Sequence, residues 1–235
     1  MGDRYDLNLP RNQINFLKSL KKENEKPLIV VVTGGSPITM PEVDELADAI
    51  VWVWYPGQEG GNAVADVIFG NEIPSGKLPL TFPLSTDQLP DYEDYSMVGR
   101  TYRYMTSKPL YPFGYGLSYT RFRFDNLYLN KEEITAGGSL VVSVDLKNSG
   151  DYNADEVVQL YVSVPDPKGN QPHWSLKNFE RISVKRGAST SISFKLDRDE
   201  LEQFNEAGET EVIPGKYTVY VGNGSPGERS RELGV

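Results

Sequence analysis

The hydrophobic pattern changes partway along the chain, and this change constrains the fold more than any other feature. The segments LIVVVT (residues 28–33) and AIVWVWY (residues 49–55) are apolar without alternation, which is typical of strands buried on both faces of a parallel sheet. Further on, apolar and polar residues alternate in the segments 140–146, 158–164, 192–196 and 217–221. The sequence therefore predicts an α/β plus all-β fold, in which a mostly parallel sheet precedes an antiparallel sandwich of about seven strands.

Helical patterns separate the apolar segments of the first part. Ile14, Leu17 and Leu20 recur at helical spacing after Pro10, which predicts an amphipathic surface helix. Residues 40–49 and the stretch around 63–68 predict two further helices, and KLPLTFP (residues 77–83) predicts a short third strand. Strands that alternate with helices indicate a parallel sheet of α/β type.

A tyrosine-rich segment joins the two parts. Its tyrosines are Tyr92, Tyr95, Tyr102, Tyr104, Tyr111, Tyr115 and Tyr119. Tyrosines bury well, and this segment lacks Gly/Ser tracts, so we expect an ordered connection that packs the parts together. Carbohydrate binding by the same tyrosines is the alternative. We expect three units, comprising an α/β portion at residues 1–83, the connection at residues 84–119 and a sandwich domain at residues 120–235.

Composition excludes several classes of function. The 24 Lys and Arg residues against 33 Asp and Glu residues give a formal charge of −9, which disfavours nucleic acid as a partner. The chain has no Cys and a single His, His173, so thiolate sites and sites with several imidazoles are excluded. No apolar run approaches the length of a membrane span. The nucleotide-binding glycine motifs are absent, and we expect no cofactor and no catalytic metal.

The loops that follow the two apolar segments are the candidate functional region. GGSPIT (residues 34–39) and PGQEGG (residues 56–61) come at the carboxyl ends of the expected parallel strands, where open α/β folds bind ligands. Glu59 is suited to general acid or ligand chemistry, or to stabilising the N-terminus of the following helix. Trp52 and Trp54 lie on one face of their strand and can pack in the core or stack on a sugar.

Four segments resemble glycoside hydrolase family 3, the β-glucosidase and β-xylosidase group. They are GDRYDLNLP (residues 2–10), WYPGQEGGNAVADVIFGNEIPSGKLPLTFP (54–83), GRTYRYMTSKPLYPFGYGLSYT (99–120) and IPGKYTVYVG (213–222). The resemblance implies the C-terminal half of an α/β sandwich domain followed by a fibronectin type III-like domain. It also implies that the nucleophilic Asp and the acid/base Glu lie upstream of this chain, the former in a barrel domain.

The family resemblance suggests roles for four residues of this chain. Asp3 and Arg4 would belong to a loop bordering the active site, and Gln58 and Glu59 to a loop near the barrel, so that all four would lie near substrate once the upstream portion is present. The expected activity is hydrolysis of terminal β-linked glucosides or xylosides, with this portion supporting the site. The alternative is a free-standing, non-catalytic module that binds carbohydrate or protein.

The same resemblance leads to an expectation about partners. The strands between Leu28 and Tyr55 are apolar on both faces, and the preceding half of their sheet would lie upstream. An uncovered apolar face and an unpaired strand edge favour association. We therefore expect the region to bind the missing N-terminal barrel portion or a second copy of the chain. Family members are often periplasmic or secreted, and the residues leave the location undetermined.

Overall fold

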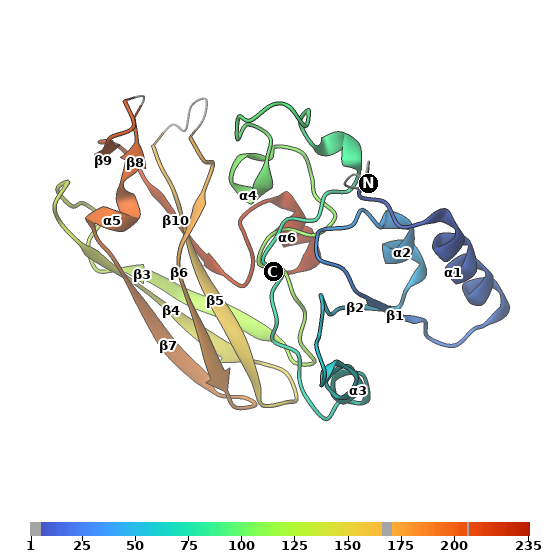
Figure 1. Cartoon of the computed structure of the whole chain (residues 1–235). Coiled ribbons are helices and arrows are strands. Elements are labelled where there is room, and N and C mark those ends of the chain that lie inside the picture. Colours follow the sequence, from blue (N-terminus) through green and yellow to red (C-terminus); the bar gives the residue numbers. More distant parts are fainter. Residues whose placement is uncertain (1–5, 166–170, 206) are drawn as a thin grey trace.

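The structure is a computed structural model, and it describes residues 6–165, 171–205 and 207–235. A smaller N-terminal part lies beside an elongated sandwich, and the tyrosine-rich connection runs between them (Figure 1). Each part has its own cluster of buried apolar side chains. The expected class, α/β followed by a β-sandwich, is confirmed.

The N-terminal part is built on two parallel strands. Its helices are α1 (Arg11–Glu23), α2 (Pro41–Leu46) and α3 (Gly60–Phe69), and its strands are β1 (Ile29–Val32) and β2 (Ala49–Trp52). The strands pair in register, with Ile29 opposite Ala49, as the predicted parallel sheet requires. Its buried cluster comprises Ile14, Val32, Ile38, Met40, Val43, Phe82, Leu110 and Tyr111. Helices α1 and α2 and the two strands thus enclose one core with residues from the connection, and α3 contributes no residue to it.

The expectation that LIVVVT is buried on both faces is wrong for this structure. Val32 is buried, whereas Ile29 and Val31, which point to the other face, are 44% and 43% exposed. The described parallel sheet has two strands, so one face of β1 lacks the cover that a larger sheet with helices on both sides would have.

The segment KLPLTFP also differs from the prediction, since it does not form a third strand of the parallel sheet. It runs beside the connection instead, where the backbone N–H groups of Leu78 and Phe82 donate to the carbonyls of Tyr115 and Tyr111 at 2.8 and 2.9 Å. Pro79 lacks an N–H donor, so the segment cannot sustain a regular ladder. The segment therefore pairs with the connection through isolated backbone hydrogen bonds.

The connection contains little regular structure. It includes a 3₁₀ turn η1 (Thr86–Gln88) and a single-turn helix α4 (Thr101–Tyr104). Five of its tyrosines make ring or hydrogen-bond contacts with the parts on either side or within the connection, and Tyr92 and Tyr95 are almost fully exposed. The predicted packing role therefore fails for these two residues.

Two antiparallel sheets, with strand orders β10-β5-β6 and β3-β4-β7, form the sandwich, and a short β8-β9 pair lies beside them. The strands are β3 (Phe122–Leu129), β4 (Leu140–Asn148), β5 (Ala154–Ser163), β6 (Ser175–Val184), β7 (Ser189–Leu196), β8 (Gln203–Phe204), β9 (Thr210–Glu211) and β10 (Thr218–Gly222). Helices α5 (Arg198–Leu201) and α6 (Glu228–Leu233) complete the chain. In β4 the buried Val142, Val144 and Leu146 alternate with less buried positions, as predicted. In β5 the predicted outward positions Gln159 and Tyr161 are buried as well, because the connection contacts them.

Candidate functional site

The two loops that follow β1 and β2 meet at the carboxyl end of the parallel sheet, as the sequence predicts. The hydroxyl of Thr33 donates to the carbonyl of Trp54 at 2.5 Å. Gly35 lies against the ring of Tyr55, where a Cβ atom would come within 2.8 Å of a ring carbon. The loops therefore contact each other closely, and a larger residue at position 35 would displace the ring of Tyr55.

Glu59 and Gln58 lie at the start of α3 and are exposed. Glu59 occupies the N-cap position, but its side chain makes no capping hydrogen bond to the helix backbone. Its carboxylate instead accepts a 2.7 Å hydrogen bond from the side-chain amide of Asn62. The position at the positive end of the helix dipole still favours the negative charge. The arrangement leaves Gln58 and Glu59 facing solvent on a loop that is fixed at its base.

Asp3 and Arg4 lie outside the described residues, so their predicted place near the same pocket stays a prediction. The chain that follows them is well anchored. The backbone N–H of Thr39, at the end of the loop after β1, donates to the carbonyl of Leu7 at 2.9 Å, and its hydroxyl donates to the side-chain oxygen of Asn8 at 2.6 Å. Leu7 and Asn8 therefore pack against one of the two candidate loops.

The tryptophans beside the candidate loops pack in the core. The ring of Trp52 is 5.2 Å from that of Trp54 and 4.8 Å from that of Phe82, edge to face in both cases. Such aromatic pairs stabilise a core beyond their buried area. These contacts support the core-packing interpretation of both tryptophans.

Tyr111 and Tyr115 pack the connection onto the N-terminal part. Their rings are stacked at 5.5 Å, and the hydroxyl of Tyr111 donates to the carboxylate of Asp44 in α2. Burial raises the pKa of both phenols above the usual range, and for Tyr111 the bond to Asp44 adds to this effect. Sequence reasoning missed Asp44, which is far from Tyr111 in the chain and has no motif around it.

Tyr102 packs the connection onto the sandwich. Its ring stacks on Phe113 at 4.3 Å and meets Tyr161 of β5 edge to face at 5.9 Å. Its hydroxyl accepts a hydrogen bond from the backbone N–H of Leu176 at 3.1 Å. Together with Tyr111 and Tyr115, this residue supports the interpretation that the tyrosines join the two parts.

Comparison with protein families identifies the chain. The profile described as the glycosyl hydrolase family 3 C-terminal domain matches residues 1–119. The chain belongs to glycosyl hydrolase family 3. A second profile, the fibronectin type III-like domain, matches residues 156–225, so the two matches follow the order of the two folded parts.

Curated proteins similar to this family 3 chain are named as xylosidases and glucosidases. A xylan 1,4-β-xylosidase from Xylanibacter ruminicola is 44% identical over 236 residues, which cover 100% of this chain and 27% of that protein. A periplasmic β-glucosidase from Salmonella typhimurium is 37% identical, with 94% and 30% covered. The chain thus spans less than a third of the length of these relatives.

Solved structures show the same arrangement. The chain superposes on a β-glucosidase from Erythrobacter marinus with a TM-score of 0.85 and 33% identity, covering 96% of this chain and 30% of that one. A β-glucosidase from Listeria innocua in complex with glucose gives a TM-score of 0.82 and 32% identity, with 94% and 32% covered. The family 3 chain therefore matches about a third of the length of these longer chains.

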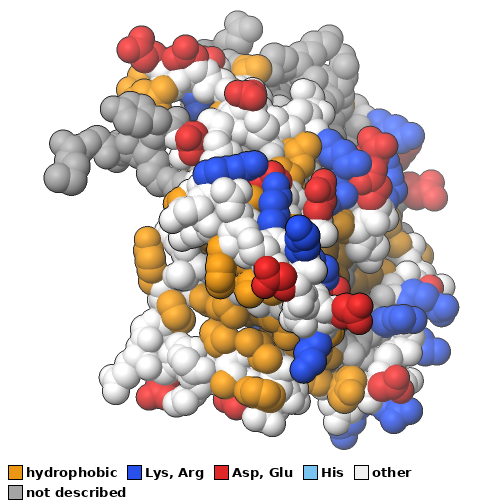
Figure 2. Space-filling view, turned by 90° about the vertical axis from the view of Figure 1, so that its right-hand side faces the viewer, with side chains coloured by type: hydrophobic (Ala, Val, Ile, Leu, Met, Phe, Trp, Pro, Cys, Tyr) orange, Lys and Arg blue, Asp and Glu red, His pale blue; other side chains and the backbone are white. Residues whose placement is uncertain are grey.

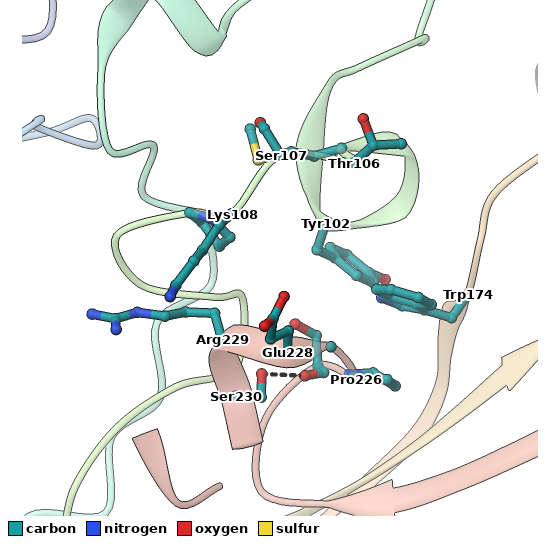
Figure 3. Close-up of a pocket in the computed structure, with 13 residues that line it drawn as sticks. Tyr102, Thr106, Ser107, Lys108, Trp174, Pro226, Glu228, Arg229 and Ser230 are labelled. Atoms are coloured by element: carbon teal, nitrogen blue, oxygen red, sulfur yellow. Dashed lines mark hydrogen bonds between the residues drawn. The ribbon is translucent and has the colours of Figure 1, made fainter. Parts of the chain in front are cut away.

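A pocket of about 130 Å³ lies where the connection, the sandwich and α6 meet (Figure 3). Tyr102 and Trp174 form one wall, and Lys108 and Arg229 approach from the other side (Figure 3). Both cations are already paired with Glu232. The adjacent His173 donates its backbone N–H to the carbonyl of Arg103 at 2.7 Å. The pocket therefore belongs to the joint of the family 3 chain and is remote from Gln58 and Glu59 in sequence.

No group of three or more His, Cys, Asp or Glu side chains in residues 6–165, 171–205 and 207–235 could hold a metal ion. Within the same ranges, no helix is long and apolar enough to cross a membrane.

Proposed function

We propose that this chain is the C-terminal portion of a β-glycosidase that hydrolyses terminal β-linked glucosides or xylosides. One observation carries the proposal: a family 3 chain matches less than a third of proteins that are named as β-xylosidases and β-glucosidases. The relation to a glucosidase that binds glucose in its crystal structure supports the same class of substrate.

In this proposal the chain shapes an active site whose catalytic pair belongs to the N-terminal portion of family 3 proteins. Retaining hydrolysis needs a nucleophile and a proton donor about 5 Å apart across the glycosidic bond. Gln58 and Glu59 are exposed at the end of the sheet, where they can exchange hydrogen bonds with sugar hydroxyls. Asp3 and Arg4 complete the proposed set of substrate-proximal residues.

Activity assays test the proposal. The purified chain should release no product from aryl β-glucosides or β-xylosides, because neither the covalent step nor the proton transfer has its carboxyl group. The chain joined to the N-terminal portion of the Xylanibacter relative should hydrolyse one of these substrates. In the joined protein, Glu59→Gln should lower kcat/KM, whereas Glu209→Gln, at an exposed turn of the sandwich, should not. Turnover by the chain alone, abolished by Glu59→Gln, would overturn the assignment.

We also propose that the N-terminal portion of the enzyme covers the open face of β1, and that a second copy covers it when the chain is alone. Hydrophobic side chains gather on the side of the molecule that carries the N-terminal part (Figure 2). The exposed apolar residues of the N-terminal part include Ile29, Val31 and Tyr55. Such a surface rarely stays uncovered in a soluble monomer.

Light scattering over a wide concentration range tests this second proposal. The intact chain should associate, and Val31→Lys should weaken the association because it places a charge on the open face. Phe179→Lys is the matched control, since Phe179 is an exposed apolar residue of β6 in the sandwich. A strictly monomeric intact chain, or equal effects of the two substitutions, would refute self-association through the region from Leu28 to Tyr55.

A further inference from the structure

A buried ion pair crosses the joint between the two parts. Nζ of Lys77 lies 2.7 Å from Oε1 of Glu156, and the two side chains are 9% and 3% exposed. Lys77 follows α3 in the N-terminal part, whereas Glu156 belongs to β5 of the sandwich. The pair therefore links elements that are far apart in the sequence, and no sequence motif predicts it.

Both charges have further hydrogen-bond partners. Lys77 also donates to the carbonyl of Gly116 at 2.8 Å. Glu156 accepts hydrogen bonds from the side chain of Asn223 at 2.9 Å and from the backbone N–H of Val157 at 2.7 Å. Buried charges are costly unless they are paired in this way, and the pair as a whole often adds little net stability. Removing one partner leaves the other charge buried and uncompensated.

The connection is held tightly between the same elements. The backbone N–H of Gly114 donates to the carbonyl of Leu78 at 2.7 Å, and its carbonyl accepts from the side chain of Gln159 in β5 at 3.1 Å. Gly114 has a φ of +80°, and a Cβ atom there would lie 2.2 Å from Oε1 of Gln159. Glycine is therefore required at this position, and the joint has little freedom to shift.

The joint also holds α3. The hydroxyl of Tyr119 in the connection donates to the carbonyl of Val67 at 2.6 Å, in the last turn of α3. The same carbonyl accepts the backbone N–H of Gly70 at 3.1 Å, so Tyr119 adds a second hydrogen bond at this helix end. The segment after α3 then runs to Lys77, where Glu156 holds it. Because Gln58 and Glu59 precede the first turn of α3, the contacts at its far end help to place this loop.

We propose that Lys77 and Glu156 are positioning residues, through which the sandwich fixes the orientation of α3 and of the loop that carries Gln58 and Glu59. The effect of the ion pair on α3 stands on the contacts of this chain alone. The further step, that this orientation matters for substrate, rests on the proposed function. The sandwich would then help to position the loop that carries Gln58 and Glu59.

Hydrogen exchange of the full chain, followed by mass spectrometry, tests the effect on α3. Glu156→Gln should raise the exchange rate of amides in residues 60–70 about tenfold, while amides of β4 and β7 keep their rates, because only the joint opens. Asp155→Asn is the matched control. Asp155 is the neighbouring residue of β5 and pairs with Arg181 at 2.8 Å on the exposed face, so the exchange of α3 should not change.

Two results would overturn the proposal. One is an unchanged exchange rate of α3 in Glu156→Gln. The other is an equal rise in α3, β4 and β7, which would mean that the pair affects only global stability. If Glu156→Gln does not fold, Lys77→Gln replaces it, since glutamine keeps a donor for Gly116 and Glu156. The assay uses no substrate, so its outcome is independent of whether the proposed glycosidase function is correct.

Discussion

The parallel sheet and the sandwich show how similar apolar sequences reach different degrees of burial. In the sandwich, Val158 and Leu160 of β5 are completely buried, because the second sheet covers them. In the parallel sheet, Ile29 and Val31 are as apolar but remain 44% and 43% exposed. Burial thus depends on whether an element of the described chain covers the strand. We propose that the sandwich is stable by itself and that the open face of β1 is covered by a partner.

The largest difference between the two parts is expected when a valine of each is replaced by alanine. Val158→Ala should lower the free energy of unfolding by about 2 kcal/mol, because it removes buried methyl groups and leaves a cavity. Val31→Ala should cost less than about 0.5 kcal/mol, as is usual at exposed sites. Urea denaturation of the two variants measures both values. Equal losses would show that the face of β1 is covered in solution, and a dilution series would then tell whether a second copy covers it.

The next largest effect is expected at alkaline pH, where buried tyrosines of the sandwich and of the connection should each lower the free energy of unfolding. Burial raises the pKa of Tyr161 and of Tyr111, and the bond to Asp44 adds to the effect at Tyr111. The unfolded phenols ionise near pH 10, so unfolding above this pH releases protons and stability falls as pH rises. Above pH 10, each phenol should lower the free energy of unfolding by up to about 1.4 kcal/mol per pH unit. Below the pKa of the unfolded phenol it should cause no loss.

Phenylalanine variants assign this loss to its source. Tyr161→Phe and Tyr111→Phe should each flatten the decline in the urea midpoint between about pH 10 and 11. Tyr92→Phe should leave the decline unchanged, because Tyr92 is almost fully exposed. A decline that is insensitive to both buried substitutions would place the alkaline loss in other groups.

The last prediction involves no change in stability and concerns the boundaries between the proposed units, which limited proteolysis should locate. We propose units at residues 1–83, 84–119 and 120–235, with the sandwich folding by itself, because its two sheets bury each other's inner faces. The first cuts should fall between Leu84 and Met105, a segment that includes the exposed Tyr92 and Tyr95. Mass spectrometry of the fragments locates the cuts. A resistant core that lacks the C-terminal half would contradict the proposed boundaries.

The elements that were predicted correctly depend on local patterns. The alternation around Val142 and Val158 specifies which residues face inward, because successive side chains of a strand point to opposite faces. The apolar runs indicated the parallel pair of β1 and β2, and the candidate loops followed from the direction of these strands. KLPLTFP was predicted incorrectly, since its backbone pairs with the connection, and a local pattern does not reveal a distant partner.

The candidate site was predictable only in part. The sequence indicated that Glu59 begins a helix, and the structure places it at the N-cap of α3 without the capping bond. The carboxylate binds Asn62 instead, a choice between two neighbouring donors that depends on the rotamer. Asp3 and Arg4 lie outside the described residues, so their place beside Gln58 and Glu59 stays a prediction.

The sequence by itself determined the order of the two parts, the inward-facing residues of the sandwich and membership of the family, because each depends on short-range periodicity or on residues contiguous in the chain. Only the tertiary structure decided which tyrosines join the parts, which face of β1 stays open and how Lys77 meets Glu156. These features depend on contacts between distant residues, such as Tyr111 with Asp44. Their energies come from burial and pairing that no single segment contains.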